Sequence, residues 1–295
     1  MNAHAVKAHP LGFLQLDPVP DPAALNAFYQ SRYYDLLRQG GRAPEIRKLL
    51  DVGGERADEL AWLEATLYHD LFDAVAPYVG EREVLDVGCG AGDLVLWLGA
   101  QGLSASGIDP STDAVAEARA RGAVAECATL ETWAKHPANM GRYGAITLVN
   151  VLEHVPDPIA VLSALRRLLA PGAALVFRVP NDFSDIQQAA EASGVARKGW
   201  WIAAPDHINY FRPETARAAC AEAGLEVVSI TADFPMELFL LMGVNYVDDP
   251  ADGQRAHAMR RRLEMTLPKA MRQRLYQALS DLGMGRNLLV TARRP

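Results

Sequence analysis

The chain has 295 residues, of which half are apolar and 22% are charged, and it carries a formal net charge of −7 at pH 7. A chain of this kind can bury one large core, or one core with an attached helical cap. The acidic balance argues against a nucleic-acid partner, the longest apolar run (236–247) is too short to span a bilayer, and three scattered cysteines favour a cytoplasmic location.

Residues 1–79 are predicted to form an N-terminal segment with a helical lid. Four prolines between positions 10 and 22 break any helix there, so we expect the first twenty or so residues to be poorly ordered. Apolar side chains then recur at helical spacing up to residue 78. Tyr33 and Tyr34 in this region are predicted to contact the substrate, with packing of a helix face as the alternative.

The most informative segment is VLDVGCGAGD at residues 84–93. It is typical of a short buried strand that ends in a glycine-rich turn and opens a helix. Gly88 and Gly90 remove side chains from the turn, so that the backbone can press against a bound ligand. The next apolar strand ends in Asp109, where a carboxylate can accept hydrogen bonds from two ribose hydroxyls. The pattern predicts a site for a nucleoside.

Two acids near the turn indicate which nucleoside cofactor it takes. Asp93 stands where a dinucleotide fingerprint needs its third glycine, and Asp86 before the turn suits a cationic ammonium group. These residues resemble the class I S-adenosylmethionine-dependent methyltransferases, whose first two motifs match residues 86–93 and 107–111. The resemblance implies an α/β fold with a Rossmann-like seven-stranded sheet and helices on both faces. It also implies S-adenosylmethionine as cofactor and S-adenosylhomocysteine as product.

The resemblance continues downstream in the expected order. Apolar runs predict the third to seventh strands at 123–127, 145–149, 174–179, 225–230 and 288–292, with an amphipathic helix over 159–169 that Pro158 opens. The core is therefore expected at 80–231, and 287–295 supplies its final strand. The motifs imply these cofactor-binding residues: Asp86, Gly88, Cys89, Gly90, Asp109, Pro110, Ala128, Thr129, Leu130, Asn150 and Val151.

The phrase VLEHVPDP at 151–158 is similar to the small-molecule branch of the family, which includes quinone O-methyltransferases. Relatives of that kind carry a further glutamate three residues before Glu153, which gives a divalent-metal site, but here that position is Asn150. One carboxylate and one imidazole suit a hard cation poorly, so we expect no required metal. Glu153 and His154 are expected to position the loop and the cofactor, with a role as base second to that of His207.

Histidine and aromatic residues gather between the fifth and sixth strands. Trp200, Trp201 and Tyr210 predict a substrate wall that is apolar over its area and polar at one edge. His207 can take a proton near neutral pH and is the predicted base. In the alternative interpretation, His207 and Asn209 cap the following helix and the tryptophans fill the core.

Strands six and seven normally form a simple hairpin in this family, but here residues 232–286 separate them. A connection this long must carry its own structure or a function, and a helical insertion is predicted. Its apolar start, with Glu237 as a substrate contact, could cap the substrate or form a homo-oligomer contact. Its basic part could meet an anionic substrate, or it could be a solvated helix face.

The predicted function is S-adenosylmethionine-dependent methyl transfer to an O or N nucleophile of a small metabolite, in polysaccharide or secondary-metabolite biosynthesis. The methyl group is already activated, so alignment and proton removal are the main tasks of the protein. Two alternatives stay open at this point. A nicotinamide-dependent oxidoreductase shares the sheet and the ribose carboxylate, and a non-catalytic relative would bind the cofactor without transferring its methyl group.

Overall fold

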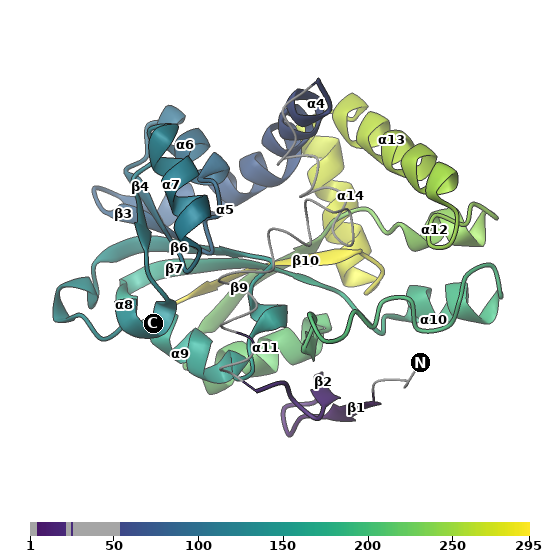
Figure 1. Cartoon of the computed structure of the whole chain (residues 1–295), viewed down its shortest axis with the longest axis horizontal. Helices are drawn as coiled ribbons and strands as arrows, with labels where there is room; N and C mark the ends of the chain where they lie inside the picture. The colour runs from purple at the N-terminus through teal and green to yellow at the C-terminus, as the bar shows by residue number, and fades with distance from the viewer. Residues whose placement is uncertain (1–4, 22–24, 26–53) are drawn as a thin grey trace. The chain divides into compact units, whose positions relative to one another are not determined.

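The computed structural model describes residues 5–21, 25 and 54–295 (Figure 1). Tyr33 and Tyr34 lie outside the described residues, so their substrate contacts stay predictions. The chain divides into two compact units, which are described separately. The first unit comprises residues 20–148 and 167–175, and the second comprises 1–19, 149–166 and 176–295. Among the helices that the structure describes, none is both long and apolar enough to cross a membrane.

The sheet has the predicted seven strands, in the order β5-β4-β3-β6-β7-β10-β9. β3 pairs in parallel with β4 and β6, β4 pairs in parallel with β5, and β9 and β10 are antiparallel. The strands are β3 (Glu83–Val87), β4 (Ala105–Asp109), β5 (Ala125–Cys127), β6 (Tyr143–Val149), β7 (Leu169–Pro180), β9 (Glu226–Ala232) and β10 (Asn287–Arg293). β7 begins at Leu169 rather than at residue 174, because buried Leu169 and Ala170 are already extended ahead of the exposed Pro171 and Gly172.

The first unit places helices around β3, β4, β5 and β6. They are α4 (Gly54–Leu63), α5 (His69–Val79), α6 (Asp93–Ala100), α7 (Thr112–Ala120) and α8 (Leu130–Trp133), with a π turn at Glu64–Tyr68 and a 3₁₀ turn at Pro137–Asn139. Local sequence sets their starts: the hydroxyl of Ser111 accepts from the Ala114 N–H, and that of Thr129 accepts from the Thr132 N–H. The helices at 54–79 agree with the periodicity of the sequence, while their role as a lid stays a prediction.

The second unit contains the remaining helices. They are the 3₁₀ turn Leu152–His154, α9 (Pro158–Leu168), α10 (Asp185–Ala192), α11 (Pro213–Glu222), α12 (Glu237–Leu241), α13 (Pro250–Thr266) and α14 (Lys269–Asp281). Two residues that follow β6 and β7, Asn150 and Phe183, have left-handed backbones with φ of 55° and 58°. An aromatic residue rarely adopts this conformation, and such strain persists only where the surroundings impose it.

Residues 5–17 form a strand hairpin, which corrects the expectation that this region is poorly ordered. β1 (Ala5–Ala8) and β2 (Leu14–Asp17), purple in Figure 1, form a hairpin, and β2 pairs with β8 (Asn209–Tyr210). Phe13 and Leu16 are buried, and the Phe13 ring lies 5.0 Å from that of Phe211. The prolines exclude a helix here, but they do not exclude a short strand outside their own positions.

The insertion at 232–286 belongs to the core of the second unit. The hydroxyl of Ser280 on α14 donates to the carbonyl of Ile230 on β9 at 2.9 Å. Arg260 and Arg272 are buried rather than solvated, and Arg260 donates to Asp233 at 2.9 Å and to Glu264 at 3.1 Å. The solvated-face interpretation is therefore wrong for these two arginines.

Candidate functional site

The glycine-rich turn after β3 has a left-handed backbone at each of its three glycines. Gly88, Gly90 and Gly92 have φ of 80°, 52° and 77°, a region that only glycine adopts without strain. The Gly88 N–H donates to the carbonyl of Ile108 at 2.8 Å, which joins the turn to β4. The side chain of Cys89 packs in a core cluster, so its backbone is what the turn can offer to a ligand.

Asp86 is a buried carboxylate at the carboxyl end of β3. The hydroxyl of Thr147 donates to its Oδ1 at 2.7 Å. Burial raises the pKa of Asp86 to about 7, the Thr147 hydrogen bond opposes this rise, and the Asp109 carboxylate adds to it. A cationic group beside Asp86 would stabilise its ionised form, as an ammonium group does.

The carboxylate of Asp109, at the end of β4, is hydrogen-bonded to the backbone of the glycine turn. Its Oδ2 accepts from the Gly90 N–H at 3.0 Å, and its Oδ1 accepts from the Ser111 N–H at 2.8 Å. Burial raises its pKa, and these two backbone hydrogen bonds limit the rise. Each carboxylate oxygen has a second lone pair, so Asp109 can still accept hydrogen bonds from ribose hydroxyls.

Asp93, the residue that breaks the dinucleotide pattern, is held by two arginines. It pairs with Arg121 and, at 3.2 Å, with Arg56 of α4. It therefore neutralises cations of this protein at the start of α6. The Ala128 N–H donates to the carbonyl of Asp109 at 3.1 Å, and Thr129 caps α8. These contacts place 128–130 beside the end of β4, while their predicted contact with the cofactor stays a prediction, as does that of Pro110.

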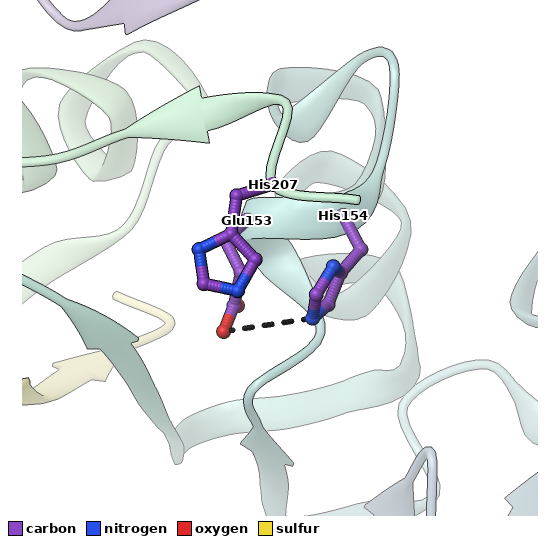
Figure 2. Close-up of side chains that lie close together, drawn as sticks. All are labelled: Glu153, His154 and His207. Carbon is purple, nitrogen blue, oxygen red and sulfur yellow. Dashed lines mark ion pairs between the residues drawn. The ribbon is translucent and has the colours of Figure 1, made fainter. Parts of the chain in front are cut away.

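Glu153, His154 and His207 come together in the second unit (Figure 2). Glu153 Oε1 lies 3.8 Å from His154 Nε2, and the two imidazole rings are 4.9 Å apart in an edge-to-face arrangement. His154 Nδ1 lies 3.2 Å from Asp206 Oδ1 and 2.9 Å from the Asp206 carbonyl. The sequence predicted three of these residues and missed Asp206, whose only signal was its place next to His207.

Opposing effects set the charges of this cluster. Burial alone would lower the pKa of His154, but the carboxylates of Glu153 and Asp206 outweigh it and raise that pKa to about 9. Burial raises the pKa of Glu153 to about 7, and the charge of His154 limits the rise. The carboxylates of Glu153 and Asp206 therefore favour the imidazolium form of His154.

The backbone around His207 is supported from both sides. The Ile208 N–H donates to the Glu153 carbonyl at 2.7 Å, and Asn209 donates to the carbonyls of Leu152 and Val155 at 3.0 and 2.7 Å. The interpretation of Asn209 as a helix cap is wrong, because α11 is capped at Arg212. Asn209 instead ties the segment of His207 to the turn of Glu153.

The same cluster offers a donor set for a metal ion. One ligand atom from each of Glu153, His154 and His207 lies within 4.8 Å of the others. Imidazole and carboxylate donors suit zinc and other transition metals, whereas magnesium needs more oxygen ligands. The geometry tests neither possibility, so the expectation that no metal is required stays a prediction.

A row of aromatic contacts leads away from His207. The hydroxyl of Tyr210 donates to the His207 carbonyl at 2.9 Å, and the Tyr210 ring lies 5.5 Å from that of Phe183. Phe183 lies 5.5 Å from Trp201, and Trp201 lies 4.6 Å from Trp200. We call these four residues the aromatic row. Trp201 and Tyr210 are buried and Trp200 is half-buried.

Glu237 is fully buried in a polar cluster that the sequence did not predict. Arg286 donates to its Oε1 at 2.7 Å, and Gln187 Nε2 lies 3.5 Å from the same oxygen. Gln187 Nε2 also donates to Asp182 Oδ1 at 3.0 Å. We call Asp182, Gln187, Glu237 and Arg286 the Glu237 cluster. Its members come from three separate segments, since Asp182 and Gln187 are close in sequence and Glu237 and Arg286 are distant, so no single local spacing reveals it.

Asn150 is also held in a network that no motif indicated. Its backbone N–H donates to the Arg178 carbonyl, and Arg178 Nη1 donates back to Asn150 Oδ1 at 2.9 Å. Arg178 Nη2 pairs with Asp233 at 3.0 Å, and Arg260 of α13 pairs with the same carboxylate oxygen. The insertion thereby supports the strained turn after β6. The predicted cofactor contacts of Asn150 and Val151 stay predictions.

Comparison with known proteins agrees on one family. A family model described as a methyltransferase domain matches residues 26–230. The ubiquinone biosynthesis O-methyltransferase of Aromatoleum aromaticum is 32% identical over 219 residues, which cover 71% of this chain and 85% of that protein. The protein of the same name from Thiobacillus denitrificans is 32% identical over 166 residues, covering 54% of this chain and 70% of its own.

Solved structures agree with the fold. A SAM-dependent methyltransferase from Archaeoglobus fulgidus has a TM-score of 0.52 and 17% identity, covering 88% of this chain and 99% of its own. Geranyl diphosphate C-methyltransferase from Streptomyces coelicolor, solved with Mg²⁺, geranyl diphosphate and S-adenosylhomocysteine, has a TM-score of 0.52 and 14% identity, covering 94% of this chain and 99% of its own. At these identities the two structures support a shared fold and nothing finer.

Proposed function

This chain belongs to the S-adenosylmethionine-dependent methyltransferases that act on small metabolites, and we propose that it methylates a hydroxyl group with His207 as the base. S-adenosylmethionine supplies a methyl group that its sulfonium centre already activates. The acceptor oxygen bonds to the methyl carbon while the carbon–sulfur bond breaks and leaves its electron pair on sulfur. The hydroxyl proton passes to His207, so charge and atoms balance.

The cofactor fits the residues around the glycine turn. The buried Asp86 carboxylate, whose pKa of about 7 reflects its burial, is proposed to pair with the cofactor ammonium group. Asp109 is proposed to accept from the ribose hydroxyls, because its oxygens keep lone pairs beyond those used by Gly90 and Ser111. The three left-handed glycines carry no side chains, so the backbone of the turn is open to the cofactor.

The choice of base rests on one observation: both ring nitrogens of His154 already face oxygen atoms of neighbouring carboxylate residues. Its Nδ1 faces Asp206 and its Nε2 faces Glu153, and the two carboxylates favour its cationic form. A protonated imidazole cannot accept a proton. His207, whose ring lies 4.9 Å from that of His154, is the cluster member proposed to accept it. Glu153 and His154 are proposed to orient it.

A labelled-methyl assay tests the base. Incorporation of label from S-adenosylmethionine into a metabolite extract is measured for wild type and for His207→Gln. Turnover is expected to fall by roughly 10²–10⁴-fold, the usual contribution of a general base, while calorimetry shows unchanged binding of S-adenosylhomocysteine. The exposed His136 gives the matched control as His136→Gln. Full turnover by His207→Gln would remove the base assignment.

Two roles are proposed for the insertion at 232–286. The unpartnered Oε2 of Glu237 at its start supports a substrate contact, and exposed apolar side chains on or next to its helices support contact between copies of the chain. These exposed side chains are Leu241, Met242, Met259, Leu263, Met265, Met271 and Leu282. Light scattering of wild type and Leu263→Glu tests the second role, because a charge in a subunit contact should shift the mass toward a monomer.

A further inference from the structure

Several buried polar atoms near the aromatic row have no hydrogen-bond partner. Glu237 Oε2, Gln187 Oε1 and Trp201 Nε1 are such atoms, and their side chains belong to residues that are 1%, 1% and 7% exposed. Leaving a buried polar group unsatisfied costs about 1–3 kcal/mol, and more for a charged group. Because several such atoms lie in one region, we infer that a ligand supplies their hydrogen-bond partners.

The neighbouring contacts fix which atom of each side chain remains available. Gln187 Nε2 faces the two carboxylates of Asp182 and Glu237, so the amide oxygen must face away from them. Arg286 and Gln187 both use Glu237 Oε1, which leaves Oε2 as an acceptor. Trp201 offers a donor. These three side chains therefore offer two acceptors and one donor, and two further buried donors beside them, Trp200 Nε1 and the Tyr246 hydroxyl, also have no partner within hydrogen-bond distance.

Trp201 belongs to the aromatic row, whose contacts end at His207. Trp201 contacts Phe183, and Phe183 contacts Tyr210, whose hydroxyl donates to the His207 carbonyl. Phe183 follows Asp182 directly and has the left-handed backbone that marks an imposed conformation. Tyr246 joins Trp200 to the Glu237 cluster: burial raises the pKa of its hydroxyl, the neighbouring Glu237 carboxylate adds to the rise, and the neighbouring Trp200 indole opposes it.

We propose that the Glu237 cluster and Trp201 bind the hydroxyl groups of a neutral, polyhydroxylated ring, such as a glycosyl unit, that forms part of the methyl acceptor. This inference rests on the proposed function, because it assigns the far end of the substrate whose near end meets His207. A hydroxyl donates to Glu237 Oε2 or Gln187 Oε1 and accepts from Trp201 Nε1. One chemical group therefore satisfies all three kinds of unpartnered atom.

Charge disfavours the other classes of ligand. A phosphate or carboxylate could accept from Trp201 and Arg286, but it would meet the carboxylates of Asp182 and Glu237. An ammonium group could donate to Glu237 and Gln187, but it would meet Arg286 and would leave the indole N–H without an acceptor. The three unpartnered atoms are buried, so the proposal includes displacement of the half-buried side chains of Trp200 and Tyr246 as the ring enters.

Three sugars that share a ring and differ in charge test the proposal. Methyl glucoside, protonated glucosamine and glucose 6-phosphate are titrated by saturation-transfer NMR into the full chain saturated with S-adenosylhomocysteine. Methyl glucoside is expected to bind best. Glu237→Gln and Trp201→Phe should each weaken its binding by about tenfold, the effect of losing one hydrogen bond to a charged or buried partner.

Glu226→Gln gives a matched control, because Glu226 also pairs with an arginine, Arg293, but on an exposed strand. Its binding of methyl glucoside should equal that of wild type. Either charged sugar binding as well as the neutral one would overturn the proposal, and so would wild-type affinity in Trp201→Phe, which keeps the ring and loses only the donor. If wild type binds S-adenosylhomocysteine but no glycoside, this inference alone is refuted. If wild type does not bind S-adenosylhomocysteine, the proposed function is refuted.

Discussion

Replacing Asp86 by Asn should make the free protein more stable and the cofactor complex weaker. The carboxylate of Asp86 is 4% exposed and its pKa is raised from 3.8 to about 7, with burial as the main cause. Because the folded-state pKa is above the unfolded-state value, its contribution to stability is fully present below pH 4 and is lost as the pH rises through 7. Asn has the same shape, can still accept from Thr147, and does not ionise.

Raising the pKa from 3.8 to about 7 corresponds to a cost of roughly 4 kcal/mol for the charged carboxylate above pH 7. We expect Asp86→Asn to exceed wild type in free energy of unfolding by roughly 2–4 kcal/mol at pH 8, and to match it at pH 4. Urea unfolding followed by circular dichroism at both pH values measures this. The exposed Asp113 on α7 gives the control variant Asp113→Asn, which should not differ from wild type at either pH.

Cofactor binding should show the opposite sign. If the ammonium group pairs with ionised Asp86, wild-type affinity for S-adenosylhomocysteine at pH 6 should be about tenfold weaker than at pH 8, since the proton must first leave. Asp86→Asn should lose about 1.5–3 kcal/mol of binding at pH 8 and should show little pH dependence. Calorimetry measures both. Equal stability at pH 8, together with pH-independent binding by wild type, would refute this account of Asp86.

Further predictions concern the turn, the ribose contact, metal and the insertion. Gly88→Val should abolish binding of S-adenosylhomocysteine, because a β-branched residue is strained at φ 80° and its side chain would occupy the ligand's path; a crystal structure with cofactor beside the valine would contradict this. Asp109→Ala should weaken the same binding by about 1–3 kcal/mol in calorimetry, and unchanged affinity would remove the ribose assignment. Dialysis against a chelator should leave methyl transfer unchanged, whereas loss of activity restored by zinc would make Glu153, His154 and His207 a metal site. Replacing 232–286 with a short turn should abolish soluble protein, because α14 covers β9; a soluble, active product would show that the insertion is dispensable.

Local signals were enough to predict the cofactor half of the site. The turn after β3 depends on three glycines at alternate positions of one short segment, and Asp109 ends the next strand, so both can be placed from the sequence. Glu153 was also placed correctly, just after the strand that became β6, at an edge that commonly forms the site in such sheets. His207 lies far beyond the end of β7, so its approach to His154 is a tertiary contact that no strand end indicates.

The Glu237 cluster and the N-terminal hairpin depend on tertiary contacts between residues that are far apart in the sequence, so no local pattern indicates them. Gln187 and Arg286 reach Glu237 from other segments, and each alone is an ordinary polar residue of a helix or a loop. The N-terminal hairpin was not predicted for a similar reason. Its two four-residue strands are too short to show a period, and β2 is stabilised by β8, which lies far along the chain.

The pairing of β2 with β8 has a consequence for the order in which the chain folds during synthesis. Leu14 and Gln15 leave the ribosome early, but their partners Tyr210 and Asn209 follow only after most of the chain has been made. Such a contact closes a long loop and forms late, because the entropy of closure must be overcome first. The segment of His207 should therefore be among the last to settle, and pulsed hydrogen exchange on the nascent chain would show late protection there.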